Sequence, residues 1–243
     1  EIASCLVGSE MCIRDRIIPL YKPGKELFTL LDKLGSQSVP VHQVILLNTE
    51  EKYFEQLIYG IRFLETYQNI KVYHVSKREF DHGGTRRMGV KKSSADVFVM
   101  MTQDAMPKDD RLIEKLVEPL QGEVAVAYAR QLPREDSTPV ESYTREFNYP
   151  AKSRIKSAAD LDSLGIKTFF CSNVCAMYDR RTYEELGGFV ESTLFNEDMI
   201  YAGHLVQAGY AIAYAADAKV VHSHNYGCLL YTSPSPRDKR QSR

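Results

Sequence analysis

Asp104 is the first candidate for a chemical role, and it follows a run of apolar residues at 97–101. Five consecutive apolar residues predict a strand that is buried on both faces, as in the middle of a parallel sheet. Ligands of open α/β sheets bind at the carboxyl ends of the strands, so Asp104 is a candidate for ligand contact. The structural alternative is an Asp that caps a helix starting near Asp109.

Phosphate binding is indicated by the segment 80–87, which contains Gly83, Gly84, Arg86 and Arg87. Two adjacent glycines at the opening of a helix allow the backbone to approach a phosphate closely. The amino end of the helix and the two arginines would supply positive potential. A flexible turn with solvated arginines is the alternative interpretation.

Two histidines, His222 and His224, end the last apolar run at 218–226. Their alternate spacing places both on one face of a strand, at the edge where other strands end. Cys171 and Cys175 have no second Cys/His pair at ligand spacing, so they are interpreted as small buried residues and not as a zinc site.

The elements that would position these residues alternate between strands and helices, the order that is typical of a doubly wound, nucleotide-binding half-domain. The polar, Pro-interrupted segment 131–167 predicts a lid or an acceptor wall. The predicted strands are 17–21, 44–47, 72–75, 97–101, 124–128 and 218–226, with a short strand or turn at 169–173. The predicted helices are 27–35, 51–67, 112–120 and 180–186, with two more opening at 83–84 and 195–199.

The composition is that of an ordinary soluble protein, with 44% hydrophobic and 26% charged residues among 243. The formal net charge of -1 argues against nucleic-acid binding, which needs a basic face. No apolar run approaches the roughly 18 residues of a membrane span and no signal peptide is visible, which leaves only peripheral contact with a membrane.

Both ends of the chain, 1–16 and 228–243, resemble translated sequencing-adapter sequence, and we expect the native part to be 17–227. Three of the five cysteines fall in these ends, so a reducing cytoplasm is favoured over a disulfide framework. The ends carry six basic and four acidic residues, so 17–227 has a net charge of -3.

With these segments in order, the chain resembles the family 2 glycosyltransferases, and more closely their bacterial rhamnosyltransferase-like branch. The resemblance extends over essentially all of 17–227. The matching segments are 17–21, 82–86, 102–105, 144–150, 169–173, 197–199 and 222–226.

The resemblance implies an α/β fold of the A-type glycosyltransferase class, with a Rossmann-like, mostly parallel central sheet flanked by helices. It divides the catalytic domain into a nucleotide-binding half, 17–130, and an acceptor half, 131–227. The implied reaction is inverting transfer of a sugar from a nucleoside diphosphate to a hydroxyl of a surface-polysaccharide or lipid-linked acceptor. L-Rhamnose from a dTDP donor is the implied sugar, and the implied location is the cytoplasm, at the inner face of the plasma membrane.

The resemblance also implies roles for single residues. Asp198 falls on the general base, while Glu197 and Asn173 would orient the loop or contact the acceptor. Asp104 stands at the last acid of the Asp-x-Asp metal motif, and Gln103 shows that one acid is absent. Mg²⁺ or Mn²⁺ can still bind such a site, because these ions fill their coordination with waters and substrate phosphates.

His222 would complete the metal site, with His224 as the second choice. Where relatives place an acidic loop, this chain has 48–51. Relatives also continue beyond 226, so a carboxyl-terminal helical segment is expected to be missing. The implied nucleotide-sugar contacts are Pro19, Tyr21, Thr49, Glu50, His82, Gly83, Gly84, Arg86, Gln103 and Asp104.

Two other functions remain open from the residues. A sugar nucleotidyltransferase needs a Gly-rich loop with a basic residue after the first strand, and 20–24 is a poor version of it. The second open function is that of a non-catalytic module that binds nucleotide sugars.

Overall fold

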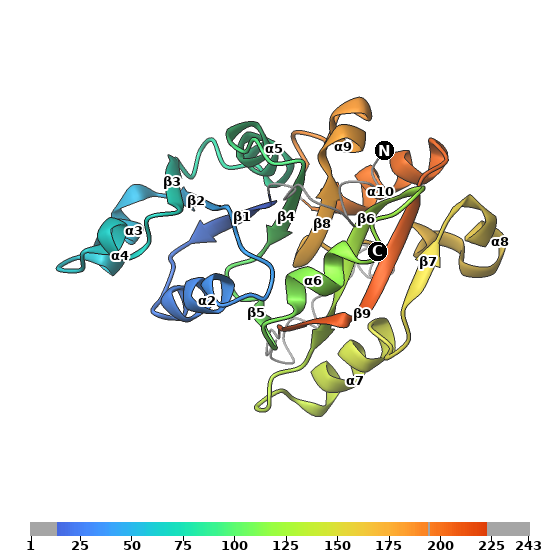
Figure 1. Cartoon of the computed structure of the whole chain (residues 1–243), viewed down its shortest axis with the longest axis horizontal. Coiled ribbons are helices and arrows are strands. Elements are labelled where there is room, and N and C mark those ends of the chain that lie inside the picture. The colour runs from blue at the N-terminus through green and yellow to red at the C-terminus, as the bar shows by residue number, and fades with distance from the viewer. Residues whose placement is uncertain (1–13, 194, 223–243) are drawn as a thin grey trace, which may run out of the picture.

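A mixed sheet of nine strands forms the centre of the molecule, in the order β3-β2-β1-β4-β8-β6-β9-β5, with β7 paired to β9 (Figure 1). The computed structural model describes residues 14–193 and 195–222. The strands are β1 (Arg14–Tyr21), β2 (Gln43–Thr49), β3 (Ile70–Val75), β4 (Val97–Met101), β5 (Met106–Pro107), β6 (Val124–Leu132), β7 (Arg154–Lys156), β8 (Cys175–Asp179) and β9 (Ala211–Val221).

Strand direction divides this sheet at β4. Strands β3, β2, β1 and β4 are parallel neighbours, and β4 then pairs antiparallel with β8. All five residues of β4 are buried, which agrees with the prediction from its continuous apolar run. Asp104 therefore leaves the sheet where its parallel half meets the rest.

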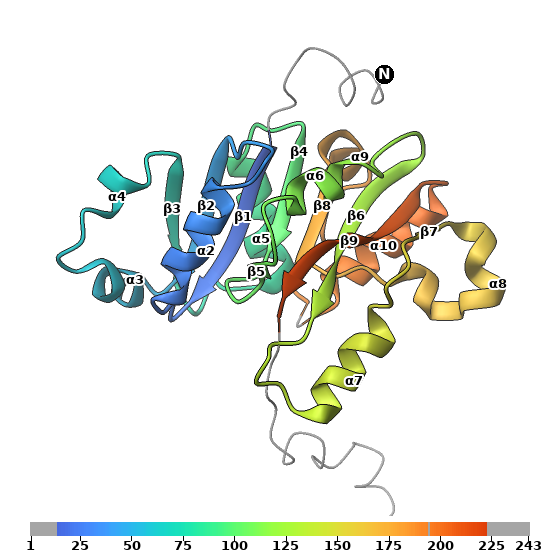
Figure 2. The same ribbon diagram turned by 60° about the horizontal axis from the view of Figure 1, so that its bottom comes forward.

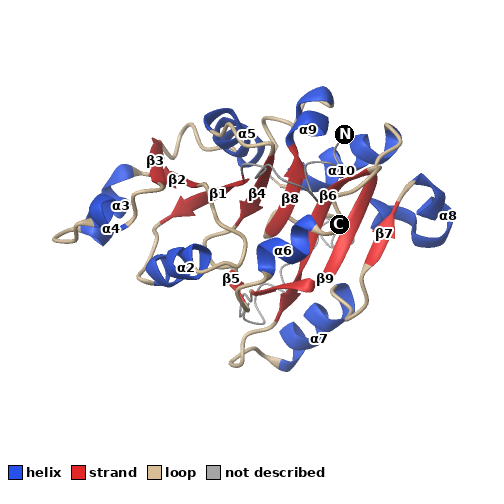
Figure 3. Cartoon of the chain, viewed as in Figure 1, coloured by secondary structure: helices blue, strands red, loops and turns tan. Residues whose placement is uncertain are grey.

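Helices cover both faces of the sheet, so the α/β architecture predicted from the sequence is confirmed (Figure 3). Figure 2 shows α2 and α6 on one face, with α5 and α10 on the other. The helices are α2 (Glu26–Gly35), α3 (Glu51–Ile58), α4 (Phe63–Thr66), α5 (His82–Lys92), α6 (Leu112–Val117), α7 (Pro139–Asn148), α8 (Leu161–Leu164), α9 (Arg180–Glu185) and α10 (Glu197–Gln207), with 3₁₀ turns η1 (Ala158–Asp160) and η2 (Gly165–Phe169).

The helix predicted at 51–67 is wrong in its length, because the chain breaks between α3 and α4. Tyr59 has an extended ψ of 124°, and Gly60 has a φ of +75° that favours glycine. After this break Phe63 is buried, while Leu64, expected on the packing face, is exposed. After the interruption at Gly60, the buried position is therefore one residue earlier than a continuous helix over 51–67 would place it.

The segment 169–173, predicted as a short strand or turn, forms no strand and ends in a turn, and β8 begins after it at Cys175. One strand prediction needs correction. The last strand begins at Ala211, seven residues before the predicted start at 218. Alanine is depleted in strands, so the Ala-rich sequence of β9 gave no strand signal.

The first strand carries an unusual side chain in its centre, Arg16, which is 0% exposed. Arg16 lies beside Val44 of β2 and Val99 of β4 in the register of the sheet. No nitrogen of its guanidinium has a hydrogen-bond partner within the described residues. Burial lowers the pKa of Arg16 to about 9, because the charged form loses its hydration.

Among the helices of residues 14–193 and 195–222, none combines the length and the apolar character that crossing a membrane requires.

Candidate functional site

The loop that carries Asp104 is fastened at two points. The Gln103 side chain accepts a hydrogen bond from Tyr21 N at 3.0 Å and donates one to Tyr21 O at 3.1 Å. Thr102 N donates to Val174 O at 3.1 Å. Helix α6 begins only at Leu112, and its N-cap residue Arg111 makes no capping bond through its side chain. Asp104 therefore does not cap α6, which removes the structural alternative for this residue.

Asp104 and His222 come together from the ends of β4 and β9. His222 Nε2 lies 3.5 Å from Asp104 Oδ2, and the exposed fractions of the two side chains are 4% and 43%. His222 N also donates to Leu132 O at 2.9 Å, which fixes the end of β9 against the end of β6. His224 lies outside the described residues, so its place at the site stays a prediction.

The orientation of the His222 ring depends on Gln131, a residue that the sequence did not single out. Gln131 Oε1 lies 3.0 Å from His222 Nδ1 and also accepts a hydrogen bond from Arg145. Because an arginine can only donate, the Gln131 oxygen must face Arg145, and His222 Nδ1 must carry a hydrogen. Nε2, the other ring nitrogen, then faces Asp104.

A divalent cation suits this pair of atoms. A carboxylate oxygen and an imidazole lone pair that face each other are favourable neighbours when a cation lies between them, and the second ring nitrogen is already held. No cluster of three or more His, Cys, Asp or Glu side chains able to hold a metal ion occurs in the part of the chain that the structure describes. Mg²⁺ and Mn²⁺ can complete such a site with waters and substrate phosphates.

Two adjacent acids at the start of α10 have different surroundings. Glu197 is buried, pairs with Arg86 NH1 at 3.2 Å and accepts from Asn173 Nδ2 at 3.0 Å. Asp198 accepts only backbone hydrogen bonds among those described, from Asn173 N at 2.9 Å and Met199 N at 2.8 Å. Burial raises the pKa of Asp198, and the negative charge of Glu197 adds to this effect. Glu197 is thus held in an ion pair with Arg86, whereas Asp198 is held by backbone N–H groups and has a raised pKa.

A hydrogen-bonded network joins the two parts of the site. Gln131 Nε2 donates to Tyr149 OH at 2.6 Å and to Ser172 Oγ at 3.1 Å. Ser172 directly precedes Asn173, whose backbone N–H holds Asp198. The contacts of Asp104 and His222 thus extend through Gln131 and Ser172 to the segment that holds Asp198.

The glycine pair at the start of α5 serves helix packing in this fold. Asp81 Oδ1 accepts from Gly84 N at 2.5 Å and caps the helix. A Cβ atom on Gly83 would lie 1.7 Å from Val190 O, so only glycine permits this approach. Arg86 is buried and donates to His82 O at 3.1 Å. Arg86 is therefore not a solvated side chain. Contact with the nucleotide sugar by His82, Gly83, Gly84 and Arg86 stays a prediction.

The predicted nucleoside contacts lie at the ends of β1 and β2. Thr49 is buried, and its Oγ1 has no hydrogen-bond partner among the described residues. Glu50 has a φ of 67°, a strained conformation for a residue other than glycine, and accepts from Lys77 N at 2.7 Å. The rings of Tyr21 and Tyr53 lie edge to face at 5.8 Å. Pro19 is half-buried and lies beside Leu47 in the register of β1 and β2, and its contact with a nucleotide sugar stays a prediction.

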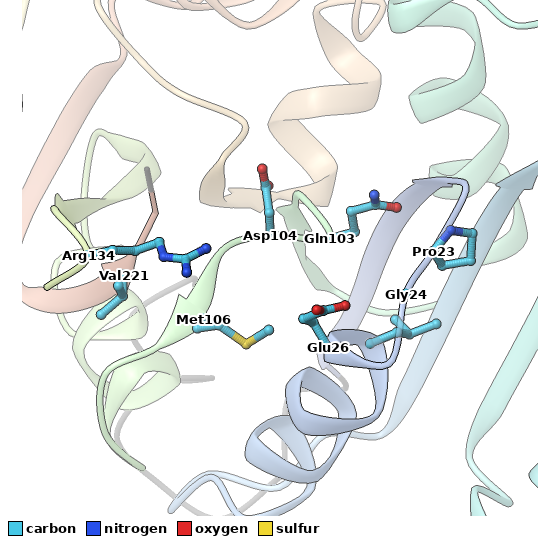
Figure 4. Close-up of a pocket in the computed structure, with 9 residues that line it drawn as sticks. Pro23, Gly24, Glu26, Gln103, Asp104, Met106, Arg134 and Val221 are labelled. Atoms are coloured by element: carbon cyan, nitrogen blue, oxygen red, sulfur yellow. The ribbon is translucent and has the colours of Figure 1, made fainter. Parts of the chain in front are cut away.

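A cavity of about 430 Å³ adjoins the Asp104 loop. Figure 4 shows the Asp104 side chain extending away from Glu26, while the Arg134 side chain points into the space between them. Arg134 is a further basic residue that the sequence did not single out. The residues that line the cavity are Pro23, Gly24, Glu26, Leu27, Gln103, Asp104, Met106, Arg134 and Val221.

The sequence held a partial signal for the Gln131 network. Arg145 and Tyr149 fall in the segment 144–150, which matches the family, yet no role followed from the match. Ser172 likewise falls in the matching segment 169–173 without an assigned role. Gln131 had no signal of its own, because a single amide is indistinguishable in sequence from that of a surface residue.

Two rhamnosyltransferases of Salmonella are similar in sequence to this chain. O-antigen chain rhamnosyltransferase RfbN of Salmonella typhimurium is 40% identical over 215 residues, which are 86% of this chain and 66% of that protein. O-antigen chain rhamnosyltransferase WbaN of Salmonella anatum is 44% identical over 163 residues, 66% of this chain and 51% of that protein. The chain therefore spans between half and two thirds of the length of these relatives.

A solved structure supports the fold. The mannosyltransferase PcManGT from Pyrobaculum calidifontis, in complex with GDP-Man and Mn²⁺, matches with a TM-score of 0.65 at 16% identity, over 90% of this chain and 59% of that chain. The predicted A-type glycosyltransferase fold is confirmed. The model of glycosyl transferase family 2 matches residues 16–187, and the chain belongs to this family.

Proposed function

We propose that this protein is an inverting rhamnosyltransferase that transfers L-rhamnose from a dTDP donor to a hydroxyl group of a growing O-antigen-type polysaccharide. The observation that carries the proposal is the 40% identity to RfbN over 86% of this chain. The chain of contacts from Asp104 and His222 through Gln131 and Ser172 to the segment that holds Asp198 supports it, because a transferase needs a diphosphate site and a base near each other. We place the reaction at the cytoplasmic face of the membrane that carries the acceptor.

The proposed reaction is a single displacement. The acceptor oxygen forms a bond to the anomeric carbon, and the bond between that carbon and the diphosphate oxygen breaks. The hydroxyl proton passes to the Asp198 carboxylate, and the nucleoside diphosphate leaves. A carboxylate that is partly desolvated and has a raised pKa is suited to this role, because its proton affinity is closer to that of the group it serves.

Asp104 and His222 are the residues that would hold the divalent cation. When bound, such a cation offsets the negative charge of the departing diphosphate. Gln131 and Arg145 would keep the His222 ring in the orientation that binding requires.

Removal of the Asp104 carboxylate should weaken metal-dependent donor binding. We expect Asp104→Ala to raise the Kd for dTDP in the presence of Mg²⁺ by about tenfold or more, or about 1.4 kcal/mol, and to leave the weak metal-free binding unchanged. Isothermal titration calorimetry with and without Mg²⁺ measures both values. The control is Asp110→Ala, an exposed acid of the loop that follows β5. Equal Mg²⁺ dependence in Asp104→Ala and the parent protein would exclude Asp104 from the metal site.

The positioning of His222 predicts a second effect on metal binding. The double variant Arg145→Met with Glu141→Gln removes the guanidinium without leaving its 2.8 Å partner Glu141 as an unpaired buried acid. Loss of an outer partner of a metal-binding histidine typically costs about 10–100-fold in metal affinity, and we expect this range for Mn²⁺. Electron paramagnetic resonance of free Mn²⁺ measures the affinity. Arg145→Lys should recover part of it, and a double variant with parental Mn²⁺ affinity would show that Arg145 does not position His222.

A donor screen tests the function itself. Calorimetry with nucleoside diphosphates and their sugars in Mg²⁺ should rank dTDP-rhamnose first, and NMR of the product should show inverted anomeric configuration. Tight donor binding with neither transfer nor slow donor hydrolysis, in a protein extended to the length of its relatives, would instead favour a non-catalytic binding module.

A further inference from the structure

A second cavity, of about 250 Å³, lies on the acceptor half between α7, β7 and η2. Figure 1 shows α7 and β7 at the end of the sheet away from β3. Four aromatic rings and four cations contribute to its wall, and none of the described residues that line it is an acid. The lining residues are Tyr128, Phe147, Asn148, Pro150, Lys152, Arg154, Lys156, Leu164, Lys167, Phe170 and Tyr214.

The deepest cation of this cavity is Lys156, which is 4% exposed. Its ammonium donates to Lys167 O and Phe170 O and lies 5.0 Å from the centre of the Tyr128 ring. No described carboxylate forms an ion pair with it, and burial lowers its pKa to about 8. A buried ammonium that is balanced only by carbonyl groups and aromatic faces leaves net positive charge in the cavity.

Two further lysines stand at the mouth. Lys167 Nζ lies 4.7 Å from the centre of the Phe147 ring, and Phe147 is itself 60% exposed. Lys152 is exposed and forms no ion pair with any described residue, whereas Arg154 is paired with Asp160 at 2.8 Å. The mouth thus combines an exposed aromatic face with cations, the combination that binds the apolar face of a sugar and an anionic substituent together.

The cavity is close to the proposed base. Phe170 is in its wall and is only three residues from Asn173, whose backbone holds Asp198. Three residues span at most roughly 11 Å, even when fully extended. Helix α10, which begins with Glu197 and Asp198, also packs against η2. A short saccharide could therefore occupy the cavity and still present a hydroxyl to Asp198.

We propose that this cavity is a subsite for an anionic group of the acceptor saccharide, with the sugar on Phe147 and the anion on Lys152 and Lys167. The proposal rests on the transferase function proposed above and adds to it the chemistry of the acceptor. The anion is either a phosphate ester or the carboxylate of an acidic sugar, since the same lysines bind both. A volume below the roughly 300–1,000 Å³ of typical ligand pockets suits one sugar with its substituent.

The test measures direct binding of small probes by ligand-observed NMR, with saturating dTDP and Mg²⁺ present to fill the donor site. Glucose 1-phosphate, glucuronate and glucose are the three probes. We expect at least one anionic probe to bind at least fivefold more tightly than glucose. The variant Lys152→Ala with Lys167→Ala should lose that advantage, while Lys71→Ala, at the opposite edge of the sheet, should keep it.

Each outcome either supports or contradicts the proposed subsite. The anionic probe that binds more tightly identifies the substituent, whereas equal binding of glucose, or an unchanged affinity in the double lysine variant, would overturn the proposal. Phe147→Ala provides a second reading without altering charge, and it should weaken all sugar probes about equally. These measurements need no transfer activity, so a protein that binds the probes through Lys152 and Lys167 but transfers no sugar would refute the proposed function and not the subsite.

Discussion

Replacing Asp198 with asparagine should lower sugar transfer by about 10²–10⁴-fold, or roughly 3–5 kcal/mol in the activation barrier, which is the usual contribution of a general base. Asparagine keeps one acceptor oxygen, which can serve the N–H of Asn173, and loses only the hydrogen bond from Met199 N, so the start of α10 should remain in place. Donor binding should therefore survive. The measurement is kcat/KM for transfer, together with the calorimetric Kd for the donor.

The pH profile gives this prediction a second readout. Because the pKa of Asp198 is raised, its carboxylate is lost at a higher pH than that of an ordinary aspartate as the solution is acidified. The acid limb of kcat/KM in the parent protein should lie correspondingly higher. Asp217→Asn, at an exposed acid of β9, is the control. Unimpaired turnover in Asp198→Asn would remove this residue from the role of base.

Replacing Arg16 with isoleucine should increase the free energy of unfolding by about 3–5 kcal/mol, because an unpaired buried charge costs several kcal/mol. The position lies beside Val44 and Val99, so a β-branched apolar side chain suits it. The expected rise in Tm is roughly 10 °C for a domain of this size. Denaturant unfolding followed by circular dichroism measures the change.

The comparison for this variant is Arg62→Ile, which changes the same pair of residue types at an exposed position. It should alter the free energy of unfolding by less than about 0.5 kcal/mol, as surface substitutions usually do. An Arg16→Ile protein no more stable than its parent would show that the guanidinium is compensated in the folded chain.

Much of the amino-terminal half could be predicted from the sequence, because β2 and β4 are buried on both faces and appear as continuous apolar runs. Val97–Met101 is the best example, since its burial and its place before Asp104 are both as expected. The helix α2 followed equally from the spacing of Leu27, Leu30, Leu31 and Leu34, all of which are buried. Local patterns suffice where a single element determines its own burial.

The site was less accessible to such reasoning, because it depends on contacts between distant segments. Asp104 and His222 are more than one hundred residues apart, and they were paired only through family resemblance. The tautomer of His222 depends on Gln131 and Arg145, and neither residue carries a pattern of its own. The separate surroundings of Glu197 and Asp198 likewise require the position of Arg86, which lies on another helix. The domain boundaries at 17, 131 and 227 stay predictions.

Because Gly83 has no side chain, the start of α5 can lie close to the backbone at Val190. The carbonyl of Val190 occupies the space that the smallest substituent would need. Even alanine would displace α5 outward and separate Arg86 from Glu197. The ion pair would be lost, and two opposite charges would remain buried without partners. A methyl group far from any reacting atom would in this way disturb the residue next to the base, so tolerance of mutation at position 83 should be as low as at the acids themselves.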